Sequence, residues 1–99
     1  SRDDAAKFLK DYYAKNILEK DPFMSLDTNG VGTLVKIATK MSKSIKPNIS
    51  LGVCGEHAAD ESSIIFFDKI WLSYISASAY RIPVAKLAAA KASLINKEQ

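Results

Sequence analysis

Cys54, Gly55, Glu56 and His57 stand together directly after a short apolar run, residues 49–53. Cys54 is the only cysteine of the chain, and His57 is the only histidine. A thiol can donate or accept a proton, and a neighbouring carboxylate and imidazole can tune it. Gly55 has no Cβ, so the backbone there can approach a ligand closely. These four residues are therefore the candidate site for acid–base chemistry.

A structural interpretation of the same residues remains open. A lone cysteine at the end of an apolar strand is commonly a small buried hydrophobe, and a histidine near a helix start can simply form a local hydrogen bond. His57, Asp60 and Glu61 match no established spacing of zinc or calcium ligands. Residues 27–30, Asp-Thr-Asn-Gly, lack the later ligands of a calcium loop and predict a turn. The sequence therefore predicts no metal site.

The candidate site is expected at the end of a strand. Residues 49–53 predict a short buried strand, residues 60–70 a helix, and residues 72–76 a second strand. A strand–helix–strand unit of this kind predicts parallel strands with a right-handed crossover. Because the carboxyl ends of parallel strands line the ligand crevice in α/β proteins, Cys54 falls where such proteins do chemistry.

Three further helices surround this unit in the predicted order helix, helix, strand, helix, strand, helix. The first is capped by Asp3 or Asp4 and ends before Pro22, since apolar residues recur at helical spacing: Phe8, Leu9, Tyr12, Tyr13, Ile17 and Leu18. The second spans residues 31–44, and the last opens with Pro83 in its first turn. Two parallel strands do not complete a sheet, so a larger α/β architecture is expected around them.

Composition narrows the class of protein. The 99 residues allow one domain, and the net charge of +3 comes from lysines scattered along the sequence. Without a basic stripe or a known module, nucleic-acid binding is not predicted. No apolar run reaches the ~20 residues of a membrane span, and one cysteine without a visible signal peptide favours the cytoplasm.

Arg81, before the last helix, is suited to hold an anion or to pair with a carboxylate. The chain begins at Ser1 without a methionine, which we interpret as a piece of a longer chain.

Beyond residues 52–57, two further segments carry distinctive patterns, at 62–67 and at 74–90. Together these segments resemble the C-terminal end of the pyruvate, phosphate dikinases, more closely than the phosphoenolpyruvate synthases or enzyme I of the sugar phosphotransferase system. The resemblance covers essentially the whole chain in order. Its N-terminal part is family-like at residues 1–4, 21–23, 26–27 and 30–32.

The resemblance implies a fold and a reaction. Members of this family interconvert ATP, phosphate and pyruvate with AMP, pyrophosphate and phosphoenolpyruvate, and they carry the phosphoryl group on a histidine of another domain. Their C-terminal domain is a (β/α)₈ TIM barrel that binds phosphoenolpyruvate or pyruvate with Mg²⁺. Residues 1–99 would form the last quarter of that barrel, incomplete as an isolated chain. The family's Mg²⁺ and substrate ligands lie upstream of Ser1, so no cofactor is expected to bind this segment alone.

The resemblance also implies residue roles. Cys54 matches the family's catalytic cysteine, which protonates the enolate of pyruvate as phosphoenolpyruvate gives up its phosphoryl group. This role suits a thiol, because an unperturbed thiol keeps its proton at neutral pH. Gly55, Glu56 and His57 would support substrate binding, and His57 is not the phosphocarrier. The expected partners are phosphoenolpyruvate or pyruvate and the rest of the parent enzyme. Alone, the segment is expected to be inactive and to self-associate through its open strand edges.

The chain departs from the family pattern at several positions. Alanines replace two glycines at 58 and 59, and Trp71 replaces a glycine in a tight turn between helix and strand. The other departures are Glu61, Ser73, Ala77 and Ala79. They leave a second hypothesis open, in which the chain is a degenerate remnant with only a structural or oligomerisation role.

Overall fold

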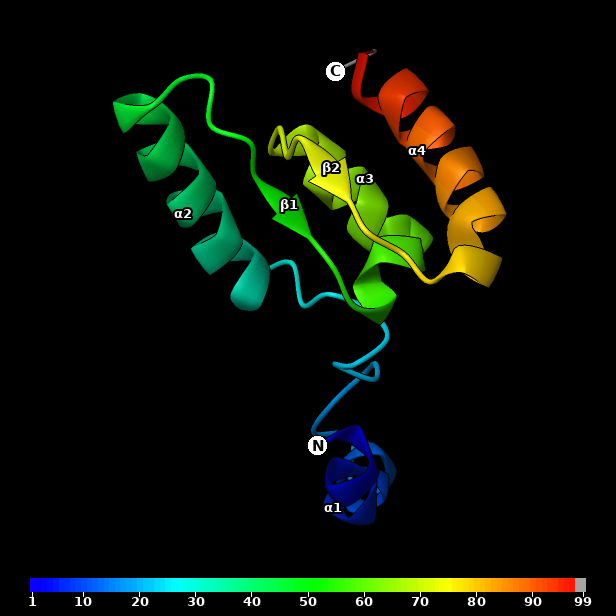
Figure 1. Cartoon of the computed structure of the whole chain (residues 1–99). Helices are drawn as coiled ribbons and strands as arrows, with labels where there is room; N and C mark the ends of the chain where they lie inside the picture. The colour runs from blue at the N-terminus through cyan, green and yellow to red at the C-terminus, as the bar shows by residue number, and fades with distance from the viewer. Residues whose placement is uncertain (98–99) are drawn as a thin grey trace.

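A computed structural model describes residues 1–97 and reveals a small α/β fold. The elements follow the predicted order, with two added 3-10 turns (Figure 1). Their bounds are α1 Arg2–Ala14, α2 Val31–Ile45, β1 Gly52–Val53, η1 Glu56–Ala59, α3 Glu61–Lys69, β2 Tyr74–Ile75, η2 Ala79–Arg81 and α4 Ile82–Lys97. Among the described residues, no helix is long and apolar enough to cross a membrane.

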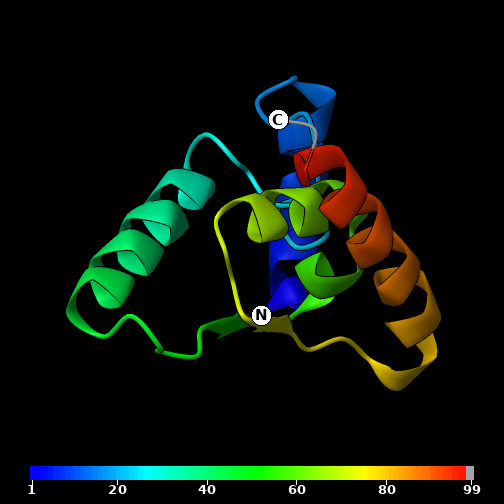
Figure 2. The same cartoon turned by 90° about the horizontal axis from the view of Figure 1, so that it is seen from above.

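The two strands pair in parallel, as predicted, with Gly52 opposite Tyr74 and Val53 opposite Ile75. Each strand has two residues rather than the predicted five. The ladder stops early because the Leu51 N–H donates to the hydroxyl of Ser73, 3.1 Å away, instead of to a backbone carbonyl. Helices α2, α3 and α4 lie on one side of the strands, with α3 between the other two (Figure 2). Within residues 1–97, none of these helices covers the opposite face of the strands.

The core lies where α3 packs against α4. Ile64 of α3 is buried against Ala85, Ala88 and Ala92 of α4. These alanines repeat at helical spacing and form one narrow face, so the two helices can approach closely. Leu87 on the same helix is exposed instead. The largest apolar side chains of α4 therefore contribute little to this core.

The starts of the first two helices show which side chains satisfy free N–H groups. The hydroxyl of Ser1 accepts the Asp4 N–H at 3.3 Å, so Ser1 caps α1 and the predicted cap by Asp3 or Asp4 is wrong. Asp27 Oδ1 accepts the N–H groups two and three residues further on, at 3.2 and 3.1 Å. The predicted turn before α2 is thereby confirmed.

The first helix ends at Ala14, well before the predicted end at Pro22. Asn16 adopts a left-handed backbone with φ of 54°. Its N–H donates to the Tyr13 carbonyl and the Ile17 N–H donates to the Tyr12 carbonyl. This pair of hydrogen bonds is the Schellman motif that ends many helices, and asparagine tolerates the left-handed position.

The third helix, predicted over residues 60–70, ends by the same motif with a tryptophan in the left-handed position. Trp71 has φ of 65°, its N–H donates to the Asp68 carbonyl, and the Leu72 N–H donates to the Phe67 carbonyl. Glycine is the residue that occupies this position at least cost. The structure thus gives a physical reason why Trp71 is an unfavourable choice in this turn.

Candidate active site

Cys54 lies immediately after β1, at the end where the parallel ladder stops. The last carbonyl of β1, that of Val53, accepts the Ser76 N–H at 2.9 Å. The Cys54 side chain is exposed, so the interpretation of Cys54 as a small buried hydrophobe is wrong. Gly55 follows with φ of 90° and ψ of −178°, a conformation open essentially to glycine alone. The thiol therefore stands at a sharp change of chain direction, accessible to a ligand.

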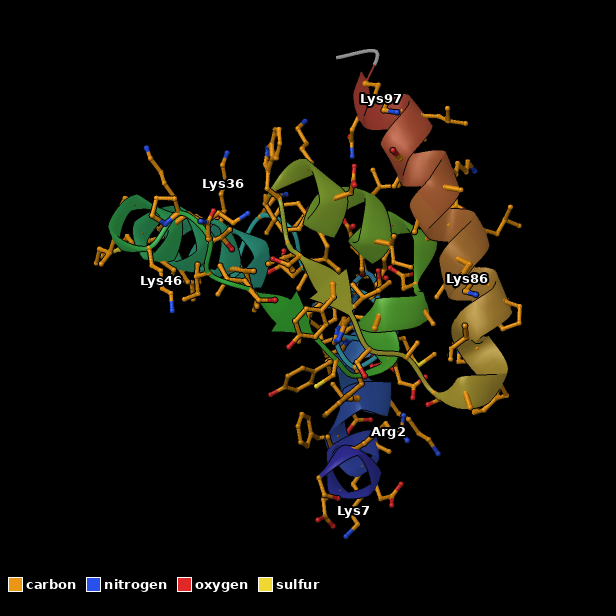
Figure 3. All side chains as sticks on the ribbon, turned by 45° about the horizontal axis from the view of Figure 1, so that its top comes forward. Arg2, Lys7, Lys36, Lys46, Lys86 and Lys97 are labelled. Carbon is orange, nitrogen blue, oxygen red and sulfur yellow. The ribbon has the colours of Figure 1, made fainter. Side chains whose placement is uncertain are left out.

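Glu56 connects this turn to two other elements. Its carboxylate accepts a hydrogen bond from Arg81 Nη1 at 2.8 Å and lies 3.9 Å from Arg2 Nη1. Arg81 ends η2, after β2, and Arg2 begins α1, whose other end projects beyond the strands (Figure 3). Side chains of Glu56 and Arg81 are only 24% and 26% exposed, so solvent screens this pair less than a surface pair. The turns after β1 and β2 are thereby joined.

His57 contacts a segment that is distant in the sequence. Its Nε2 lies 2.8 Å from the carbonyl oxygen of Pro22, which only accepts hydrogen bonds, so Nε2 carries a proton and donates it. This bond anchors the segment between α1 and α2 against η1. His57 thus has a structural hydrogen bond, as the structural interpretation expects, but its partner lies 35 residues away in the sequence, so the bond is not local.

Asp60 caps α3 and gathers several hydroxyl groups. Its Oδ2 accepts the Ser63 N–H and the hydroxyls of Ser63, Ser62 and Ser25 at 2.6–3.1 Å. Burial raises the pKa of the Asp60 carboxyl, but these hydrogen bonds outweigh it and hold the pKa below its usual range. The fully buried Ser63 also accepts the Leu26 N–H, which fastens the preceding loop to α3.

Tyr74 belongs to the same face of the sheet as Cys54, which the sequence alone did not indicate. Residues two apart on a strand share a face, so Gly52 and Cys54 do. A Cβ on Gly52 would lie 2.2 Å from a Tyr74 ring carbon, so the ring rests directly on Gly52. A glycine opposite an aromatic residue could have indicated this contact in the sequence. Recognising that pair, however, requires the register of the two strands.

The residues around Cys54 do not fit a metal site. Within residues 1–97, no group of three or more His, Cys, Asp or Glu side chains is arranged to hold a metal ion. Glu56 already lies between two guanidinium groups, whose positive charge opposes a bound cation. An exposed thiol in a fixed turn can instead exchange a proton with a ligand placed above it.

Comparison with known proteins identifies the family. Residues 3–94 match the model of the PEP-utilising enzyme family, PEP-binding domain. The pyruvate, phosphate dikinase of Clostridium symbiosum is 52% identical over 97 residues, 98% of this chain and 11% of that protein. That of Rickettsia typhi is 54% identical over 95% of this chain and 11% of its own length. The chloroplastic enzyme of Flaveria bidentis is 50% identical over 92% of this chain and 10% of its own length.

The chain thus spans about a tenth of the length of these curated relatives. The match runs along nearly all of the chain, as the resemblance in its motifs indicates. The resemblance to pyruvate, phosphate dikinase is confirmed, and the chain belongs to the PEP-utilising enzymes, in the family of their PEP-binding domain.

Proposed function

We propose that this chain is the C-terminal part of a cytoplasmic pyruvate, phosphate dikinase and supplies the proton donor of its phosphoenolpyruvate half-reaction. The whole enzyme would interconvert ATP, phosphate and pyruvate with AMP, pyrophosphate and phosphoenolpyruvate. The observation that carries this proposal is the exposed Cys54 thiol directly after a parallel strand. Sequence identity of about half to named dikinases along nearly the whole chain supports it.

In the proposed architecture, residues 1–99 form the last quarter of a (β/α)₈ barrel. Parallel sheets are normally covered on both faces, yet here the helices α2, α3 and α4 lie on one side only (Figure 2). The strand face left without helices would line the barrel interior, where neighbouring strands complete it. Large exposed apolar side chains, such as Leu34 on α2 and Leu87 on α4, also fit surfaces that other parts of the parent cover.

The proposed chemistry uses this chain's residues for one proton transfer. As phosphoenolpyruvate gives up its phosphoryl group, the Cys54 S–H bond breaks and the proton bonds to the methylene carbon of the enolate, which gives pyruvate and a thiolate. In the reverse direction the thiolate removes that proton. Gly55 gives the turn its shape, the Glu56–Arg81 pair fixes the turn, and His57 anchors the following residues. Mg²⁺, held by residues of the parent outside this chain, would stabilise charge on the substrate.

The experiment is substitution of Cys54 in the complete parent enzyme. Cys54→Ala should lower turnover by about 10²–10⁴-fold, the usual contribution of a general acid, and abolish exchange of the methyl protons of pyruvate with solvent. Ser78→Ala, at an exposed position after β2 and outside the proposed chemistry, is the control. Unchanged proton exchange in Cys54→Ala would overturn the assignment. Purified residues 1–99 alone should not turn over phosphoenolpyruvate with Mg²⁺, because the metal ligands belong to the parent.

A second candidate, a degenerate remnant with only a structural role, is favoured by Trp71 in its left-handed turn. The two candidates differ in what a chimera would do. If the chain is a working segment, replacing the corresponding segment of a complete dikinase with these residues should preserve turnover. A chimera that folds, unfolds at the same temperature as the parent, and turns over slowly would favour the remnant.

A further inference from the structure

Four lysines of two helices line one hollow between α2 and α3. Its volume is about 580 Å³, and its walls include Lys36, Lys40 and Lys43 of α2 and Lys69 of α3. Among the residues that the structure describes, no carboxylate lines it. Lys46 is separate from this group, because it points to the opposite side of α2 from Lys36 (Figure 3). The hollow therefore concentrates positive charge that is not evident from the modest net charge of the chain.

The walls of this hollow are held together at both ends. Near the start of α2, a Cβ on Gly32 would lie 3.0 Å from the Phe66 ring, so glycine lets that ring pack against the helix. Near the other end, Lys43 Nζ donates a hydrogen bond to the Trp71 carbonyl. Contacts at both ends give the hollow a defined shape without a ligand, which reduces the cost of binding one.

The charges of Lys36, Lys40 and Lys43 are not neutralised by carboxylates close to them in the sequence. Residues 28–55 contain no Asp or Glu. Asp27 and Asp68 are not among the residues that line this hollow: Asp27 accepts hydrogen bonds from two backbone N–H groups, and Asp68 lines the adjacent hollow, where it accepts a hydrogen bond from Asn96 at 2.7 Å. Ammonium groups of this kind are suited to phosphate oxygens, which several lysines can contact together.

Trp71 gives the hollow a second kind of binding surface. Its indole is 76% exposed at the edge of the hollow, and the left-handed backbone at Trp71 holds it there. An exposed indole can stack with a planar ring, and a volume near 580 Å³ lies in the range of small-molecule sites. Ammonium groups beside an exposed indole favour a ligand that carries both negative charge and a planar ring.

We propose that this hollow binds an organic polyphosphate with a planar ring, its phosphates on Lys36, Lys40 and Lys43 and its ring on Trp71. The site is separate from the Cys54 turn and does not depend on the proposed dikinase function. GTP is the probe, because it carries a purine ring and a triphosphate and is not a reactant of that function. Binding is read without Mg²⁺ from the fluorescence of Trp71, the only tryptophan of the chain.

In the 99-residue chain, GTP should quench this fluorescence saturably and should bind at least about fivefold more tightly than inorganic tripolyphosphate, through stacking. Lys36→Gln/Lys40→Gln should weaken binding by at least about tenfold, since two of the phosphate contacts are lost. Lys10→Gln/Lys86→Gln changes the net charge equally away from the hollow and should leave affinity within about twofold. Circular dichroism checks that both variants keep their helices.

Three results would overturn the proposal. If GTP gives neither saturable quenching nor heat of binding in isothermal titration calorimetry, the hollow holds no such ligand. An equal loss of affinity in the two double variants would show attraction by net charge only. Equal affinities for GTP and tripolyphosphate would show that the planar ring does not contribute to binding.

Discussion

Trp71 occupies a left-handed backbone position that is unfavourable for a residue with a Cβ. A left-handed conformation costs a residue with a Cβ about 1–2 kcal/mol relative to glycine, while glycine loses part of that gain through its flexible unfolded state. Because the indole is 76% exposed, little packing is lost with it. We expect Trp71→Gly to raise the free energy of unfolding by about 0.5–1 kcal/mol in urea denaturation.

Trp71→Ala is the matched control, because it removes the ring but keeps the Cβ that causes the strain. It should leave the free energy of unfolding unchanged or slightly lower it. If alanine stabilises the chain as much as glycine does, the ring and not the backbone is the unfavourable feature.

Asp60 makes part of the stability depend on pH. Its hydrogen bonds hold the pKa of the folded carboxyl below its usual value of 3.8, despite the opposing effect of burial. A group with a lowered folded pKa stabilises the fold fully above its unfolded pKa and loses that contribution as the pH falls through the folded value. The Asp60 contribution should therefore be complete at pH 7 and lost below about pH 4.

Asp60→Asn tests this, since asparagine also caps helices but does not ionise. The free energy of unfolding is measured with urea at a series of pH values from 7 to 2.5. At pH 7 it should be lower for Asp60→Asn than for the unsubstituted chain. The difference should shrink as the pH falls below 4. A difference that stays constant over this range would contradict the assigned charge.

At the scale of elements, the Glu56–Arg81 pair holds the turn after β1 to the start of α4. Because this pair is three-quarters buried, we expect a coupling free energy of about 1–2 kcal/mol in a double-mutant cycle with Glu56→Gln and Arg81→Met. The Lys91–Glu61 pair is more than half exposed and should couple by less than about 0.5 kcal/mol. A coupling for Glu56–Arg81 below about 0.5 kcal/mol would mean that this ion pair does not hold the turn.

Element order, parallel pairing and the positions of α2 and α3 could be predicted from apolar spacing and turn residues. The end of α1 could not, because Tyr13 and Ile17 continue a helical pattern that Asn16 interrupts through its backbone. The strands are short because the Ser73 side chain takes a ladder hydrogen bond, which no periodicity reveals. For the site, Cys54 and the glycine turn were predictable. The Glu56–Arg81 pair and the Tyr74 ring depend on contacts distant in sequence.

At the scale of the whole molecule, apolar side chains repeat along the exposed side of α2. Val31, Leu34, Met41 and Ile45 lie three, seven and four residues apart, which places them on one helix face, and all are exposed. The buried residues of α2 are instead Gly32 and Thr39. A contiguous apolar face of this kind rarely stays in water in a monomeric protein.

The isolated chain should therefore self-associate, helped by the open edges of β1 and β2. Size exclusion with light scattering should give a mass above the 10.8 kDa of one chain, rising with concentration. Leu34→Lys/Met41→Lys should shift the chain toward the monomer, because burying two ammonium groups in the contact is costly. Lys7→Leu/Lys15→Leu, which adds apolar surface on α1 and just beyond it, should not reduce the mass. If the unsubstituted 99-residue chain stays monomeric at every concentration, the exposed apolar face of α2 does not drive association.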